Sequence, residues 1–99
     1  MTEGMTFQKV LMKEFGLNSD VVSAALVCVP RVQKLGTLYI PRKKALTALA
    51  EYLDRRVDEN RAKDEKCQLE GNGSPYFARL AAKYAEKAAR VRATMEAEA

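Results

Sequence analysis

The chain contains no histidine and only two cysteines, Cys28 and Cys67, which lie in different segments. Structural zinc sites are built from four cysteine or histidine ligands at short spacings, so a zinc centre is excluded, and we expect neither a metal nor a cofactor. Nothing in the sequence marks a secreted protein, the class in which disulfides are common. We therefore expect two reduced, buried thiols, although a disulfide between them stays open.

The sequence also lacks the motifs that many enzyme active sites need. It has neither the G-x-x-x-x-G-K loop that holds phosphates nor the G-x-G-x-x-G turn of dinucleotide-binding folds. Adjacent acidic pairs such as Asp58 and Glu59 point to different sides of a helix, so their carboxylates do not converge on a proton or a metal. We predict that the protein is not an enzyme.

Long apolar runs are missing as well. No stretch approaches the roughly 20 apolar residues that cross a membrane. The first ten residues, MTEGMTFQKV, contain no apolar core of a signal peptide. We expect a cytoplasmic protein with no membrane partner.

What the sequence does contain is an uneven distribution of charge. Its 99 residues fit one domain, and 47% hydrophobic with 30% charged residues is typical of a chain that folds. Residues 1–50 hold seven basic and three acidic residues, whereas residues 51–99 hold ten of each. The formal net charge of +4 therefore belongs to the first half. Between residues 30 and 44 there is no acidic residue but a group of five basic ones: Arg31, Lys34, Arg42, Lys43 and Lys44.

The pattern of apolar residues predicts a mostly all-α fold. Spacings of three and four residues, with prolines as boundaries, indicate helices near residues 6–15, 19–29, 42–68 and 75–97. The only β-favouring run is Thr37-Leu38-Tyr39-Ile40, which follows Leu35-Gly36 and stops at Pro41. We predict one small β-hairpin between residues 31 and 40.

The two long helices are expected to form an antiparallel helical hairpin over residues 42–98. The sequence EGNGS, residues 70–74, is a strong break between them. The last helix has an apolar stripe close to a heptad pattern, but many of its members are alanines, which bury little area each. Because this helical hairpin buries little apolar area by itself, we expect it to associate with a second copy and form a homodimer. The residues expected to make that contact are Phe77, Leu80, Tyr84 and Val91.

The order of these elements resembles the winged helix-turn-helix of phage excisionases and MerR-type DNA-binding domains. The resemblance covers residues 7–53 and is carried by FGLNSDVVSAAL and KLGTLYIPRKKALTALAEYL. It implies that the second helix enters the major groove of DNA while the hairpin, called the wing, lies on the phosphate backbone. The phosphate contacts it implies are Arg31, Lys34, Arg42, Lys43 and Lys44. The base contacts it implies are Asn18, Ser19, Asp20 and Ser23.

Two classes of function therefore remain open. The first is a small DNA-binding regulator or recombination accessory protein with a helical dimerisation tail, which the segregated positive charge favours. The second is a non-enzymatic protein-binding module, such as a phage-encoded inhibitor or adaptor of a host protein. The second helix favours this alternative, because SDVVSAALVCV has no basic residue and is apolar nearly all round.

Overall fold

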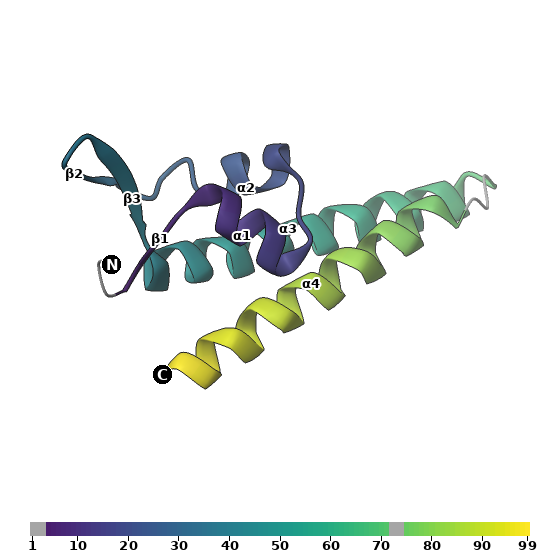
Figure 1. Ribbon diagram of the computed structural model, residues 1–99. Helices are drawn as coiled ribbons and strands as arrows, with labels where there is room; N and C mark the ends of the chain where they lie inside the picture. The colour runs from purple at the N-terminus through teal and green to yellow at the C-terminus, as the bar shows by residue number, and fades with distance from the viewer. Residues whose placement is uncertain (1–3, 72–74) are drawn as a thin grey trace.

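Four helices and three short strands make up the part of the chain that the computed structural model describes, residues 4–71 and 75–99 (Figure 1). In chain order they are β1 Met5–Thr6, α1 Gln8–Phe15, α2 Ser19–Ala25, β2 Val32–Lys34, β3 Thr37–Pro41, α3 Arg42–Leu69 and α4 Tyr76–Glu98. The prediction of a mostly helical fold is confirmed, with a small antiparallel sheet in addition. The middle of the predicted EGNGS break, residues 72–74, lies outside the described residues.

The first two helices follow the predicted order but differ at their ends. α1 ends at Gly16, whose φ of 62° is the left-handed conformation that glycine adopts most readily. α2 ends at Ala25 instead of continuing to Val29. Val29 donates its backbone N–H to the carbonyl of Leu26 in a tighter turn, and Pro30 disfavours a helical conformation in the residue before it. The chain therefore leaves the helix early and turns toward the sheet.

The sheet has the strand order β1-β3-β2, with both pairs antiparallel. Lys34 lies opposite Thr37, so Leu35 and Gly36 form a two-residue turn between β2 and β3, as predicted for residues 31–40. The strand β1 was not predicted. Thr6 lies opposite Ile40, and the N–H of Arg42 donates to the carbonyl of Gly4 at 2.8 Å. Residue 6 therefore belongs to the sheet and not to the first helix.

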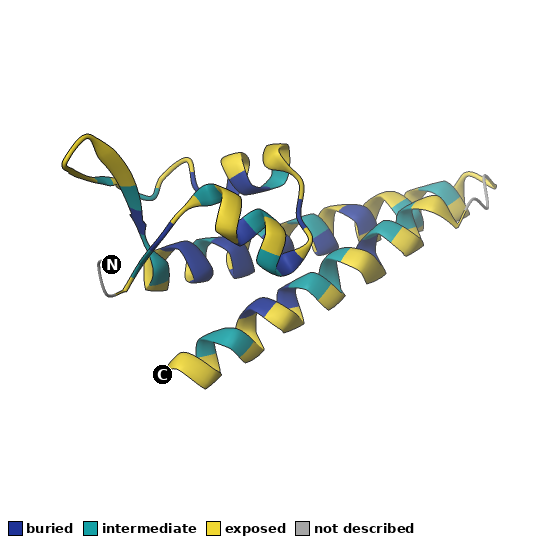
Figure 2. Cartoon of the chain, viewed as in Figure 1, coloured by how far each residue is buried: buried dark blue, intermediate teal, exposed yellow. Residues whose placement is uncertain are grey.

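The core lies along α3, which packs against α2, β3 and α4. Figure 2 shows the buried residues of α3 along the sides that face the short helices and α4. The residues of α3 that are buried are Ala45, Leu46, Leu49, Ala50, Leu53, Val57 and Asn60. Asn60 carries a buried amide, which donates from Nδ2 to the backbone carbonyl of Arg56 at 2.7 Å and so makes a hydrogen bond inside the core.

α4 lies beside α3 and runs in the opposite direction (Figure 1). Its buried residues are Ala81, Ala88 and Val91. Val91 is fully buried within the single chain. It therefore has no exposed surface with which to make the expected contact with a second copy. Phe77, Leu80 and Tyr84 are half-buried.

The two cysteines are free thiols, and they do not form a disulfide with each other. The expectation that both are buried is wrong. Cys28 is exposed in the turn that follows α2, and Cys67 is only half-buried near the end of α3. Cys28 lies beyond the end of α2, and Cys67 lies one turn and more past Asn60, the last buried residue of α3.

The central role of α3 predicts that shortening two of its leucines to alanine lowers the free energy of unfolding by very different amounts. Leu49 is fully buried, so Leu49→Ala should lower the free energy of unfolding by about 2–5 kcal/mol through lost burial and a residual cavity. Leu69 on the same helix is 83% exposed, so Leu69→Ala should change it by less than about 0.5 kcal/mol. Urea denaturation of both variants measures the difference. Equal effects would contradict this account of the core.

Candidate nucleic-acid interface

Four of the five basic residues predicted to contact phosphates are exposed at one end of the molecule. Lys34 lies in β2 and Arg31 just before it, while Lys43 and Lys44 lie in the first turn of α3. β3 ends at Pro41 and α3 begins at the next residue, so no loop separates the β-hairpin from the helix. The strand pair and the start of α3, which carry these cations, therefore adjoin one another in the fold (Figure 1).

Arg42 is held differently from these four residues. Its Nη1 and Nη2 donate to the two carboxylate oxygens of Glu14 at 3.0 and 2.7 Å. Its Nε and Nη2 donate to those of Glu98, both at 2.7 Å. Only 19% of the Arg42 side chain is exposed. The guanidinium thus ties together α1, the start of α3 and the end of α4, and the phosphate contact expected of Arg42 has no free donor face to make it.

This contact, here called the Arg42 clamp (Arg42, Glu14 and Glu98), changes the pKa values of Arg42 and Glu98. Hydrogen bonds to Glu98 and then to Glu14 raise the pKa of Arg42 above its ordinary value, so its charge is permanent. The hydrogen bond from Arg42 lowers the pKa of Glu98, because it stabilises the ionised carboxylate. Glu98 is 56 positions from Arg42, and no feature of the sequence pairs the two.

The residues expected to contact bases lie at the N-cap and along α2, but two of them already make hydrogen bonds within the fold. Oδ1 of Asn18 accepts from the backbone N–H of Val21 at 2.9 Å and so caps α2. The hydroxyl of Ser23 accepts from Nε2 of Gln8 at 2.7 Å. Ser19 and Asp20 are exposed in the first turn. The side of α2 that faces solvent is therefore small and polar, without a basic residue.

The apolar character of the second helix has a simple structural reason. Val22, Ala25 and the adjoining Leu26 are buried against the core. Of the valines in this segment, Val27 is 79% exposed, but it lies beyond the end of α2. The helix therefore turns its apolar residues inward and does not require a partner protein to cover them.

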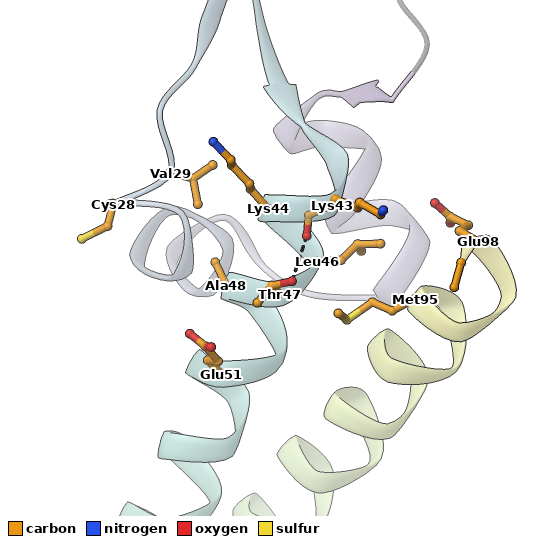
Figure 3. A pocket seen from close by; sticks show the side chains of 11 residues that line it. Cys28, Val29, Lys43, Lys44, Leu46, Thr47, Ala48, Glu51, Met95 and Glu98 are labelled. Carbon is orange, nitrogen blue, oxygen red and sulfur yellow. Dashed lines mark hydrogen bonds between the residues drawn. The ribbon is translucent and has the colours of Figure 1, made fainter.

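A groove that the sequence did not reveal opens beside the start of α3 (Figure 3). It encloses about 550 Å³ between the turn after α2, the first turns of α3 and the end of α4. Apolar atoms come from Val29, Leu46, Ala48 and Met95, with Lys43, Lys44, Glu51 and Glu98 as charged neighbours. In Figure 3 the side chains of Lys43 and Lys44 point away from one another. The groove has the chemistry to hold an apolar side chain between charged edges.

No protein-family model, curated protein or solved structure matches this chain. Among residues 4–71 and 75–99, no helix has both the length and the apolar character that a membrane crossing requires. In the same residues, no three cysteine, aspartate or glutamate side chains come together as a metal site would need.

The Arg42 clamp predicts a stability that depends on pH. Because the folded pKa of Glu98 is lowered, its ionisation stabilises the fold above the unfolded pKa of about 4.3. That contribution is lost as the pH falls through the lowered value. Since 43% of the Glu98 side chain is exposed and screened, Glu98→Gln should cost at most about 1 kcal/mol at pH 7. The difference from the parent should shrink below about pH 4.

Chemical denaturation of the parent and Glu98→Gln between pH 7 and acid measures this dependence. Glu96→Gln is the matched control, because it removes the same charge from an exposed residue of α4 that has no part in the clamp. It should leave the free energy of unfolding unchanged at every pH. A Glu98→Gln effect that persisted undiminished in acid would rule out the ion pair as its cause.

Proposed function

We propose that this protein is a small DNA-binding regulator or recombination accessory protein of the winged helix-turn-helix kind. In this proposal, the β-hairpin formed by β2 and β3 is the wing, and it binds duplex DNA together with the first turn of α3. The observation that carries the proposal is the set of exposed cations at this end of the fold: Arg31, Lys34, Lys43 and Lys44, here called the wing cations.

The balance of charge supports a polyanion as the partner. Residues 4–50 contain seven basic residues but only two acidic ones, Glu14 and Asp20. Glu14 is occupied by Arg42, and Asp20 lies in the first turn of α2, where a negative charge suits the helix dipole. The wing cations therefore have little negative charge near them within residues 4–50, although Glu51 and Glu98 line the groove beside Lys43 and Lys44. DNA phosphates would supply it and release counterions on binding.

The placement of the wing cations also suggests what kind of DNA binding to expect. The outer side of α2 offers short polar side chains such as Ser19 but no arginine or lysine for guanine edges. Phosphate contacts position a protein on DNA, whereas base contacts give specificity. The proposed protein thus gains most of its affinity from the wing cations and little sequence preference from α2.

The proposal predicts that the affinity for duplex DNA falls with salt concentration and that reversing two of the wing cations abolishes binding. Four phosphate contacts give a slope of about −3.6 for log K against log salt concentration. Lys43→Glu with Lys44→Glu should abolish binding to duplex DNA at about 50 mM salt, where such contacts are strong. The same change should leave the fold equally or more stable, because acidic residues suit the start of α3 better than cations do. Fluorescence anisotropy and thermal denaturation measure the two effects.

A matched control separates the site from net charge alone. Arg61→Glu with Lys66→Glu changes the total charge by the same amount at exposed positions in the second half of α3. This variant should bind duplex DNA nearly as well as the parent. If both reversed proteins bound equally, or if the parent did not bind at low salt, the DNA-binding proposal would fail.

The groove at the start of α3 favours a second candidate, a protein-binding module such as an inhibitor or adaptor of a host protein. Its apolar residues Leu46 and Met95 lie next to an exposed turn that carries Val27 and Cys28. The neighbouring groove between α2 and α3 is also lined by Val27, Cys28 and Ala48. This candidate becomes the leading one if the parent shows no affinity for duplex DNA.

We further propose that α3 and α4 form a helical hairpin that serves as the dimerisation tail. The surface available for this role differs from the expected stripe, because Val91 is buried within the chain. The rings of Phe77 and Tyr84 also lie under Lys63 and Arg56, at 5.7 and 5.5 Å from the ring centroids. The half-buried Leu80 lies between these two rings along α4.

Leu80→Asp is therefore expected to convert a dimer to a monomer, because it places a charge in the middle of the proposed contact. Sedimentation at tens of micromolar measures the mass. Ala82→Asp is the control, since Ala82 is exposed and lies two residues further along α4, on a different side of the helix. A parent that sedimented as a monomer would contradict the proposed dimer. A Leu80→Asp variant with the same sedimentation mass as a dimeric parent would contradict the proposed contact.

A further inference from the structure

The tip of the β-hairpin carries an apolar side chain where the fold has no use for one. Leu35 is fully exposed, at 105% of its reference area. Its φ of 51° is the only positive value of a residue other than glycine in the described chain, and Gly36 follows with a φ of 78°. Two successive positive φ values define a turn that strongly prefers asparagine, aspartate or glycine.

Leucine is a poor choice at this position for the stability of the protein itself. Its branched side chain is disfavoured in the left-handed conformation, and it gains nothing from burial here. Asparagine at residue 35 would make the same turn with less strain. A leucine that does not serve the turn or the core is available for a contact outside the chain.

The shape of the hairpin decides which contact fits. Ile40 at its base is 2% exposed, whereas every residue from Gln33 to Leu38 is exposed. Three residue steps from Ile40 to Thr37 span roughly 10 Å, and the turn lies beyond them. The minor groove of DNA is about 7.5 Å deep and about 6 Å wide. A paired strand ladder is too wide to enter, but a single side chain at the tip is not.

The residues around the tip complete the match to DNA. Lys34 directly precedes Leu35, and Arg31 lies just before β2, so cations lie along the β2 arm of the hairpin while its end is apolar. Leu38 lies in β3, 55% exposed, and adds apolar surface just behind the tip. One leucine and its neighbour are too small an area for a stable protein interface or a membrane anchor. Stacked bases bordered by phosphates suit a small apolar tip with cations along one of its arms.

We infer that Leu35 is a wedge that enters the minor groove of duplex DNA and partly unstacks one base step, while Lys34 and Arg31 contact the bordering phosphates. The inference rests on the proposed DNA binding and adds to it a second function, the bending of the duplex. Apolar wedges of this kind kink DNA by about 20–90°. Flexible steps such as TA are deformed at the lowest cost, so they are the expected site of insertion.

The test uses a short duplex with a central TA step and a fluorescent dye at each end. Anisotropy reports binding, and energy transfer between the dyes reports bending. The parent should bend the duplex by an angle of about 20–90°. Leu35→Asn should bind more weakly with the same salt slope and should lose most of the bend. It should also melt at the same or a higher temperature than the parent, which shows that the turn is intact.

Leu69→Asn is the matched control, because Leu69 is an equally isolated exposed leucine at the far end of α3. It should bend the duplex as the parent does. If the parent bound without bending, or Leu35→Asn bent the duplex as strongly as the parent, the wedge would be overturned while DNA binding stood. A parent that bound no duplex would overturn both, and stronger Leu35-dependent binding to anionic vesicles than to the duplex would assign the tip to a membrane instead.

Discussion

The burial of one side of α3 is the interaction on which the other parts of this protein depend. Leu46, Leu49 and Leu53 are almost fully buried, in a core to which α1, α2, β3 and α4 all contribute. Neither the short helices nor the sheet has enough apolar surface to fold without that support. Because α3 begins at the residue after β3, packing of the helix also sets the direction of the β-hairpin. The position of the wing cations is therefore a consequence of core packing.

Five basic residues that look alike in the sequence have two different roles in the structure. Arg42 faces inward between two carboxylates, and its planar guanidinium can donate to both at once, which a lysine could not do in the same geometry. Lys43 and Lys44, the next two residues of α3, point toward solvent. The Arg42 clamp holds the end of α4 against the start of α3. It therefore supports the surface from which the neighbouring lysines project, without contacting a ligand itself.

Local patterns in the sequence predict the helices and the β-hairpin, but they predict neither β1 nor the contacts between elements. Leucines at positions 46, 49 and 53 predict a helix, and Gly36 beside a β-favouring run predicts a hairpin, because both signals act over a few residues. The two residues of β1 are too few to show a period. The side of α4 that contains Val91 has the same spacing whether it faces the core or a second copy, so its burial could not be read from the pattern. The link from Arg42 to Glu98 spans 56 positions and exists only after the chain has folded.

The distribution of charge also bears on the DNA binding and the dimer that we propose. In the proposed DNA binding, four cations and a small tip would offer modest affinity, most of it independent of sequence and sensitive to salt. A dimer would place two wings on one duplex, and the second would bind at a high effective concentration once the first was engaged. The neutral balance of residues 51–99 fits this arrangement, because ten basic and ten acidic residues add no net repulsion between two copies of the helical pair. A net positive charge in the first half and a neutral second half therefore both suit the proposed binding scheme. In that scheme, affinity comes from joining two weak, deforming contacts and not from a basic recognition helix.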